Sequence, residues 1–158
     1  MSISKNVAGL VSGVLRMPFF AIPALLKGKG PGAFHQADAA AARTLFGAKA
    51  LGPAAAGLFR DVRLTSADGT ALHAVEDDGS RRDPRKRPLV FVHGFPELWV
   101  AWRAQLLHFA SKGHPVLALS CRGYGLSDKP QNVAAYKLDR LAEDVAAAVG
   151  HAALSSGG

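Results

Sequence analysis

The residues of this chain with the clearest capacity for chemistry lie in a loop that follows a short apolar run. The run PLVFV, residues 88–92, is followed by HGFPELW. A glycine directly after a buried strand lets the backbone turn sharply and approach a bound group closely, and Pro96 then fixes φ at the start of the next turn. A main-chain N–H in such a turn can stabilise a developing oxyanion. The loop therefore predicts an oxyanion-binding backbone.

A second loop, CRGYGLSDKP at residues 121–130, follows another apolar run, PVLAL. Its glycines do not predict a phosphate site, because the Lys and Ser/Thr of a phosphate-binding loop are missing. Cys121 is the one cysteine of the chain, which excludes an internal disulfide and a multi-cysteine metal site. We expect Cys121 to be a small packing residue.

The elements that must position these loops follow from hydrophobic periodicity. Residues 59–65 and 70–76 have strand character, and the Asp-Gly between them is typical of a hairpin turn. Residues 88–92 and 115–119 are runs of the kind buried in parallel sheets. Helices are predicted over 98–111 and 138–149, so the order strand, helix, strand, helix indicates an α/β fold with parallel pairing. In such a sheet the ligand site lies beyond the carboxyl ends of the strands, where both loops are.

The apolar spacing also predicts which helix faces are buried. The inward residues of the first helix are expected to be Trp99, Trp102, Leu106 and Phe109. Those of the second are expected to be Leu138, Leu141, Val145 and Val149. The basic stretch from Arg81 to Arg87 is interpreted as a solvated loop between strands.

Together, VFVHGFPELWVAWRAQ, RGYGLSDKP and LAEDV resemble the epoxide hydrolase branch of the α/β-hydrolase superfamily, with the haloalkane dehalogenases next. The resemblance covers residues 59–149. It implies the first four strands and first two helices of a doubly wound hydrolase sheet. The parent reaction it implies is hydrolysis of a small apolar epoxide, or of an ester, through an ester intermediate and without metal or cofactor.

The resemblance also implies roles for individual residues. The backbone N–H of Phe95 would belong to the oxyanion hole, and Phe95 and Trp102 would contact substrate. Trp99 is expected to be a core aromatic residue. Ser120 stands where the family commonly has an acid. The remaining matched residues would shape the two loops, with His93 as a structural residue and not a base: His93, Gly94, Pro96, Arg122, Gly123 and Asp128.

The nucleophile that such an enzyme needs is not evident in the sequence. Gly150-His151 is followed by Ala152 and not by a carboxylate. Ser155 fits a nucleophile elbow formally, but no apolar strand precedes it, and residues 151–158 are interpreted as a tail. We therefore expect a truncated, inactive epoxide hydrolase-type protein. The alternatives are a non-catalytic fragment that binds a partner, or a fragment of an ester hydrolase or dehalogenase.

The N-terminal part differs from the rest in composition. Residues 1–60 hold seven of the basic residues and one acid, whereas residues 61–158 are nearly neutral, so no nucleic-acid partner is indicated. Residues 1–30 are basic and contain an apolar run from 7 to 26. This favours membrane contact, with organelle targeting second and a packing helix third. Residues 31–57 are interpreted as an Ala/Gly-rich helix or linker, and residues 58–150 as the partial hydrolase domain.

Overall fold

The computed structural model describes residues 43, 44 and 46–155. The apolar segment predicted over residues 1–30 lies outside the described residues, as does most of the first half of the 31–57 segment. Within the part that is described, no helix has the length and apolar character needed to cross a membrane. The predicted membrane and targeting roles of the N-terminal segment therefore stay predictions.

The predicted hairpin is confirmed. Strand β1 (Phe59–Thr65) pairs antiparallel with β2 (Ala71–Asp77). The turn between them closes with a hydrogen bond of 2.9 Å from the backbone N–H of Ser66 to the carbonyl of Thr70. Gly69 has φ of 85°, a conformation that glycine adopts without a steric penalty. The Asp-Gly signature thus has its expected physical cause.

The predicted parallel pairing is also confirmed. Strand β3 (Leu89–Val92) runs parallel to β4 (Val116–Ser120), in the register Leu89↔Val116 to Val92↔Leu119. Strand β4 pairs on its other side with β2, in antiparallel fashion, so the four-stranded sheet is mixed and has the order β1-β2-β4-β3. Every residue of β4 is buried, as an apolar run between two strands predicts.

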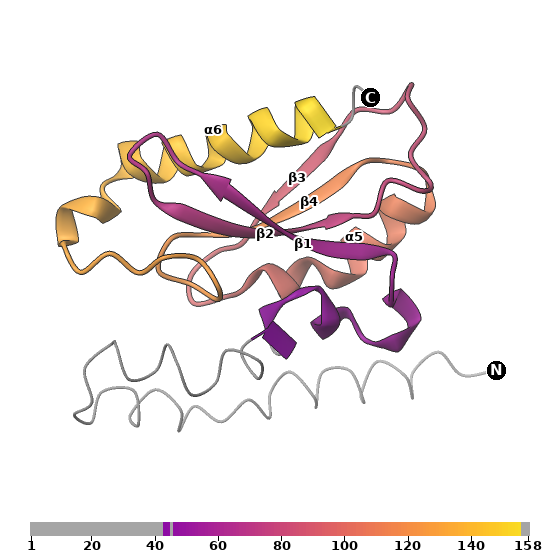
Figure 1. The fold of residues 1–158 in the computed structure, drawn as a ribbon, viewed down its shortest axis with the longest axis horizontal. Helices are drawn as coiled ribbons and strands as arrows, with labels where there is room; N and C mark the ends of the chain where they lie inside the picture. The colour runs from indigo at the N-terminus through magenta and orange to yellow at the C-terminus, as the bar shows by residue number, and fades with distance from the viewer. Residues whose placement is uncertain (1–42, 45, 156–158) are drawn as a thin grey trace. The chain divides into compact units, whose positions relative to one another are not determined.

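One helix covers each face of the sheet (Figure 1). Helix α5 (Arg103–Ser111) lies on one face and continues from a short 3₁₀ helix, η3 (Trp99–Trp102), so the predicted helix over 98–111 begins with a tighter turn. Helix α6 (Leu138–Ser155) lies on the other face. Three further 3₁₀ helices complete the described elements: η1 (Ala48–Leu51), η2 (Pro53–Ala55) and η4 (Val133–Tyr136).

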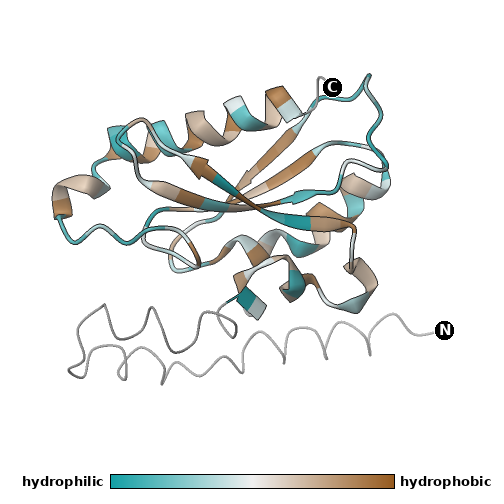
Figure 2. Ribbon diagram, viewed as in Figure 1, coloured by the Kyte–Doolittle hydropathy of each residue, from teal (hydrophilic) through white to brown (hydrophobic). Residues whose placement is uncertain are grey.

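Two apolar clusters hold these layers together. On the α5 side, Trp99 and Leu106 are fully buried against Val75 and Ala118 of the sheet. The Trp99 indole N–H donates to the carbonyl of Phe46 at 2.6 Å, which confirms Trp99 as a core aromatic residue. On the α6 side the cluster contains Leu64, Leu72, Ala74, Leu117, Leu119 and Ala148. Figure 2 shows the corresponding hydrophobic colouring along β3 and β4.

The predicted inward face of the second helix is partly wrong. Leu138 is 79% exposed and Val149 is 51% exposed. The residues of α6 that are buried against the sheet are Asp144, Ala148 and Ala152. Two alanines let the helix approach the strands closely, and Asp144 is drawn inward by a buried arginine described below. The spacing of apolar residues predicted that the larger ones would be buried. The ion pair of Asp144 instead sets the rotation of the helix about its axis.

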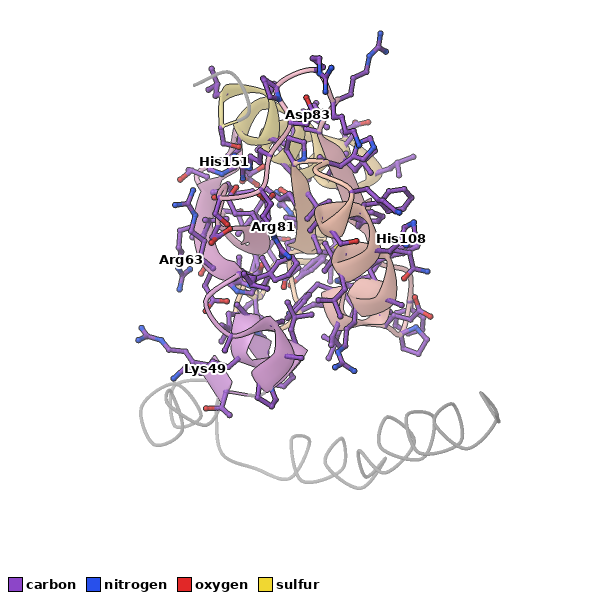
Figure 3. All side chains as sticks on the ribbon, turned by 90° about the vertical axis from the view of Figure 1, so that its right-hand side faces the viewer. Lys49, Arg63, Arg81, Asp83, His108 and His151 are labelled. Atoms are coloured by element: carbon purple, nitrogen blue, oxygen red, sulfur yellow. The ribbon has the colours of Figure 1, made fainter. Side chains whose placement is uncertain are left out.

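The interpretation of residues 151–158 as a tail is also wrong for residues 151–155, which form the last turns of α6. The C-terminal part of this helix is held by charged groups. His151 reaches toward the sheet, where its Nε2 lies 3.0 Å from Oε2 of the buried Glu76 (Figure 3). The Arg82 guanidinium donates to the carbonyl of Ser155 at 2.5 Å and to the carboxylate of Asp77 at 2.6 Å.

The basic stretch before β3 is a loop, as predicted, and most of its side chains are exposed. Arg81, Arg85 and Arg87 are exposed, whereas Arg82 is only partly exposed because it joins Asp77 to α6. The hydrogen bonds from Arg85 lower the pKa of Asp83 to about 2. The Arg85–Asp83 pair lies within the exposed loop, which supports the solvated-loop interpretation.

Strand β3 is an edge of the described sheet. The Leu89 N–H donates to the carbonyl of Pro115 at 2.9 Å, beside β4. Because successive residues of a strand direct their backbone groups to alternate sides, the N–H and C=O groups of Val90 and Val92 point to the open side. An unpaired apolar edge of this kind is a template for pairing with another chain.

We therefore expect the purified chain to self-associate through β3. Val90→Pro removes an outward N–H without removing a ladder bond, and should weaken association at least ~10-fold because an edge strand tolerates proline there. Val90→Ala is the matched control, since it shortens the side chain and keeps the N–H. Sedimentation velocity over a concentration series measures the effect. A monodisperse wild-type chain with a sharp thermal transition would contradict the expectation, and so would equal association of both variants.

Candidate functional site

A hollow of about 400 Å³ lies at the carboxyl ends of β3 and β4, where the two loops were predicted to meet. One wall comes from the loop after β3, the second from the loop after β4, and the third from α6 and η4. The lining side chains are mostly apolar, and they include Phe95, Cys121, Tyr124, Tyr136, Leu141 and Val145. A volume of this size and a mostly apolar lining are common among small-molecule sites.

His93 joins the two loops. It is the first residue after β3 and is 7% exposed. Its Nε2 accepts a hydrogen bond of 3.1 Å from the backbone N–H of Cys121, and its Nδ1 lies 2.9 Å from the carbonyl oxygen of Gly94. The ring of Tyr124 packs edge-on against the imidazole at 4.9 Å between centroids. Both ring nitrogens are therefore occupied by backbone groups, and the loop-shaping role of His93 stays a prediction.

Phe95 stands at the opening of the hollow with 88% of its surface exposed. Among the described residues no hydrogen bond uses its backbone N–H. The carbonyl of the preceding Gly94, by contrast, accepts from the N–H of Glu97 at 3.0 Å in addition to its contact with His93. The Phe95–Pro96 peptide bond is cis. An unpaired N–H at the edge of a largely apolar hollow is available to a ligand oxygen.

Arg122 is the centre of a buried polar network. It is 1% exposed, and its guanidinium donates two hydrogen bonds to the carboxylate of Asp144 on α6, at 2.7 and 2.6 Å. It also donates to Asp68 in the hairpin turn at 2.9 Å and to the carbonyl of Ala135 in η4 at 2.7 Å. The hydrogen bond with Asp144 raises the pKa of Arg122, and the hydrogen bond from Arg122 holds the pKa of Asp68 well below its usual range.

Gly123 and Asp128 hold the loop after β4. Gly123 has φ of 86°, and a Cβ at this position would lie 3.0 Å from the ring of Tyr136, so a larger residue would strain the backbone and press on that ring. Its N–H donates to the carbonyl of Asp128 at 2.8 Å. The Asp128 carboxylate accepts from the N–H of Ala71 at the start of β2 at 2.9 Å. These contacts join the loop after β4 to the start of β2, and the loop-shaping roles stay predictions.

Trp102 lies outside the lining of the hollow. Its ring packs against Phe91 of β3 at 5.5 Å between centroids, on the α5 side of the sheet. Its indole N–H is buried and has no partner within the described part of the chain. Contact of Trp102 with substrate stays a prediction.

Sequence reasoning missed a buried chain of hydrogen bonds beside the loop after β4. Ser120 Oγ lies 2.9 Å from Nδ1 of His73, and Nε2 of His73 lies 3.0 Å from the carboxylate of Asp61. Since a carboxylate only accepts, Nε2 carries the proton and Ser120 donates to Nδ1. A serine bonded to a histidine that is bonded to an aspartate is also the arrangement of a catalytic triad. Ser120, however, has 0% exposure and cannot reach a substrate. The chain therefore joins β1, β2 and β4 and is structural.

The remaining polar groups around the hollow are not activated. Burial raises the pKa of the Cys121 thiol, with a further contribution from Asp144, so the thiolate is disfavoured. Burial also raises the pKa of Tyr124 and Tyr136. In residues 43, 44 and 46–155 no group of three or more His, Cys, Asp or Glu residues could hold a metal ion. The described hollow thus offers a backbone donor and apolar walls.

The comparisons with known proteins agree with this geometry. Residues 87–157 match the family model of the alpha/beta hydrolase fold. The chain is 41% identical over 83 residues to Epoxide hydrolase B of Mycobacterium tuberculosis, and 41% identical over 85 residues to Epoxide hydrolase 1 of Caenorhabditis elegans. The alignments cover 52% and 54% of this chain, but only 23% and 20% of those proteins. The chain therefore spans a quarter or less of their length.

Solved structures give the same result. An epoxide hydrolase from Vigna radiata superposes with a TM-score of 0.53 at 28% identity, over 61% of this chain and 29% of that one. Epoxide Hydrolase A from Mycobacterium thermoresistibile superposes with a TM-score of 0.52 at 29% identity, over 60% of this chain and 28% of that one.

The Arg122 network predicts a large effect for Asp144→Ala. Breaking a buried pair leaves a buried charge without its partner, so the free energy of unfolding should fall by ~3 kcal/mol or more. Glu143→Ala is the matched control, because the neighbouring Glu143 pairs with Arg140 on the helix surface and should contribute less than ~1 kcal/mol. Urea denaturation compares the two variants. Equal destabilisation would show that the buried pair does not fix α6.

His73 predicts a pH dependence of stability. Burial lowers its pKa, and this outweighs the opposing hydrogen bond to Asp61. The unfolded chain then binds the proton more readily than the folded one, so stability is fully present above pH ~6.5 and decreases as the pH falls below it. One proton changes the free energy of unfolding by at most ~1.4 kcal/mol per pH unit. Chemical denaturation at several pH values measures this change. The free energy of unfolding of His73→Gln should depend less on pH than that of the wild type, and an identical dependence would refute the prediction.

Proposed function

Because the chain carries part of an alpha/beta hydrolase fold and is similar to epoxide hydrolases over about half of its length, we propose that it supplies the oxyanion-binding side of an epoxide hydrolase-type active site. The substrate class would be a small apolar epoxide, which suits the mostly apolar lining of the hollow. The nucleophile, the acid and the catalytic histidine would come from chain beyond these elements or from another polypeptide.

The observation that carries the proposal is the N–H of Phe95, which lies at the edge of the hollow and has no hydrogen-bond partner among the described residues. In this reaction a carboxylate attacks an epoxide carbon, the ring C–O bond breaks, the alkoxide so formed takes a proton from an acid outside the described residues, and a hydroxy-ester to the enzyme forms. Water then adds to the carbonyl of that ester, so negative charge develops on the carbonyl oxygen. A backbone N–H aimed at this oxygen stabilises the charge without reorganisation.

The described residues of the hollow do not supply the attacking group. The carboxylate of Asp144 is held by two hydrogen bonds from Arg122. His93 has both ring nitrogens occupied by backbone groups, so it is not placed as a base. Ser155 lies in the last turn of α6, and its hydroxyl donates to the carbonyl of Ala152. The interior of a helix turn does not present a nucleophile as a strand-to-helix elbow does.

A second candidate function is partner binding without catalysis, and the open edge of β3 favours it. Both functions use the same surface, since a chain that pairs with β3 would be placed beside the hollow. They differ in whether the Phe95 N–H contributes to turnover. An ester hydrolase or dehalogenase would share the oxyanion donor and differ in its nucleophile.

The proposed function is tested with the isolated chain and with a chimera. The 158-residue chain alone should hydrolyse neither epoxides nor activated esters above buffer. When its matching segment replaces the aligned 83 residues of Epoxide hydrolase B of Mycobacterium tuberculosis, the chimera should hydrolyse epoxides. In the chimera, Phe95→Pro removes the N–H and should lower kcat by ~100-fold to 1,000-fold, the usual effect of losing one oxyanion donor.

Phe95→Leu is the matched control in the chimera, since it changes the side chain and keeps the N–H. Ester intermediate should accumulate in Phe95→Pro, which rapid-quench mass spectrometry detects. A folded but inactive chimera, or equal kcat in the two variants, would favour the partner-binding function. Turnover by the isolated chain that disappears in Ser155→Ala would overturn the assignment of the nucleophile to other residues.

A further inference from the structure

The aromatic ring of Tyr136 forms the part of the hollow's wall that comes from η4. Tyr136 is one of the lining residues, and 37% of its surface is exposed. Its ring lies against the backbone of Gly123, since a Cβ added there would be 3.0 Å from Cε1 of Tyr136 and 3.3 Å from its hydroxyl oxygen. The absence of a side chain at Gly123 therefore gives the ring its place beside the loop after β4.

The backbone that carries this ring is fixed by contacts of its neighbours. The carbonyl of Ala135 accepts from the buried guanidinium of Arg122 at 2.7 Å. Asn132 begins η4, and its side-chain oxygen accepts from the N–H of Ala134 at 2.9 Å. The hydroxyl of Tyr136, by contrast, has no hydrogen-bond partner in the part of the chain that the structure describes. The ring can therefore be replaced without removing a hydrogen bond of the Arg122 network.

The other walls of the hollow are largely aliphatic. Helix α6 contributes Leu141 and Val145, and strands β3 and β4 contribute Val92 and Leu119. At about 400 Å³ the hollow is near the lower end of the range for small-molecule sites, which is ~300 to ~1,000 Å³. In a space of this size one aromatic ring is a large part of the lining, so its replacement changes which apolar group fits.

We propose that Tyr136 is a specificity-determining residue of the hollow: its ring sets the upper size of the apolar group that a bound epoxide can carry. The inference rests on the proposed function for the substrate class, and it adds a limit on size that an apolar lining alone does not give. Apolar burial is non-directional, so an apolar wall selects between ligands by the surface they bury and by steric overlap. A ring on a fixed backbone supplies that overlap.

Equilibrium dialysis of the full 158-residue chain tests the proposal with two probes, styrene oxide and trans-stilbene oxide, which differ by one phenyl ring. The measured quantity is the ratio of the two Kd values. Tyr136→Ala should shift this ratio by at least ~10-fold in favour of trans-stilbene oxide, the order of effect that pocket size has on discrimination. Tyr136→Leu should give an intermediate shift, and it keeps an apolar side chain against Gly123 if Tyr136→Ala does not fold.

Two matched variants separate the ring from other effects. Tyr136→Phe keeps the ring and loses the hydroxyl, so it should keep the wild-type ratio. Val133→Ala removes an apolar side chain of the same 3₁₀ helix that is 85% exposed and lies outside the lining, so it should also keep that ratio. Circular dichroism identifies the variants that are folded.

Three outcomes would overturn the inference. These are no saturable binding of styrene oxide to the wild type, an unchanged ratio in the folded members of the pair Tyr136→Ala and Tyr136→Leu, and an equal shift in Tyr136→Phe or Val133→Ala. Dialysis measures binding, whereas the Phe95→Pro comparison measures turnover, so the two failures are distinguishable. A ratio that follows Tyr136 beside an inactive chimera supports the inference and rejects the proposed function, and an active chimera with an unchanged ratio does the reverse.

Discussion

The buried ion pair between Arg122 and Asp144 is the interaction on which the arrangement of the other elements depends. Its two side chains are 0% and 3% exposed, so neither charge can be left without its partner at low cost. The same guanidinium reaches the hairpin turn through Asp68 and η4 through the carbonyl of Ala135. One side chain thus sets the position of α6 relative to the sheet and closes one end of the hollow.

Local signals in the sequence were sufficient to predict the hairpin and the parallel strand pair of the sheet. The Asp-Gly turn, the two buried apolar runs and the helix between them follow from backbone sterics and from burial, which act over a few residues. They predicted the hairpin, the parallel pairing of β3 with β4, and loops that meet at the carboxyl ends of the strands. The order β1-β2-β4-β3 is consistent with the resemblance on which the partial hydrolase fold was predicted.

Features set by contacts between distant residues were not predictable in this way. The apolar spacing of α6 placed Leu138 and Val149 inside, but Arg122 turns Asp144 toward the sheet and leaves both outside. Residues 151–155 resembled a tail because Glu76 and Arg82, which hold them, lie far away in the sequence. The Ser120–His73–Asp61 chain was missed for the same reason: its members come from three strands.

The proposed oxyanion donor would be organised without the groups that attack the substrate. Its geometry depends on hydrogen bonds within and between two loops, made by His93 on one side and by Gly123 and Asp128 on the other. All of these partners lie in the described residues, whereas a nucleophile would have to meet the hollow from outside them. In the proposed reaction the oxyanion forms only after a covalent ester exists. The N–H donor and the nucleophile would therefore act in successive steps on the same bound substrate. Under the proposed function, pre-organisation of the donor half would therefore belong to this part of the fold, and catalysis would belong to the complete site.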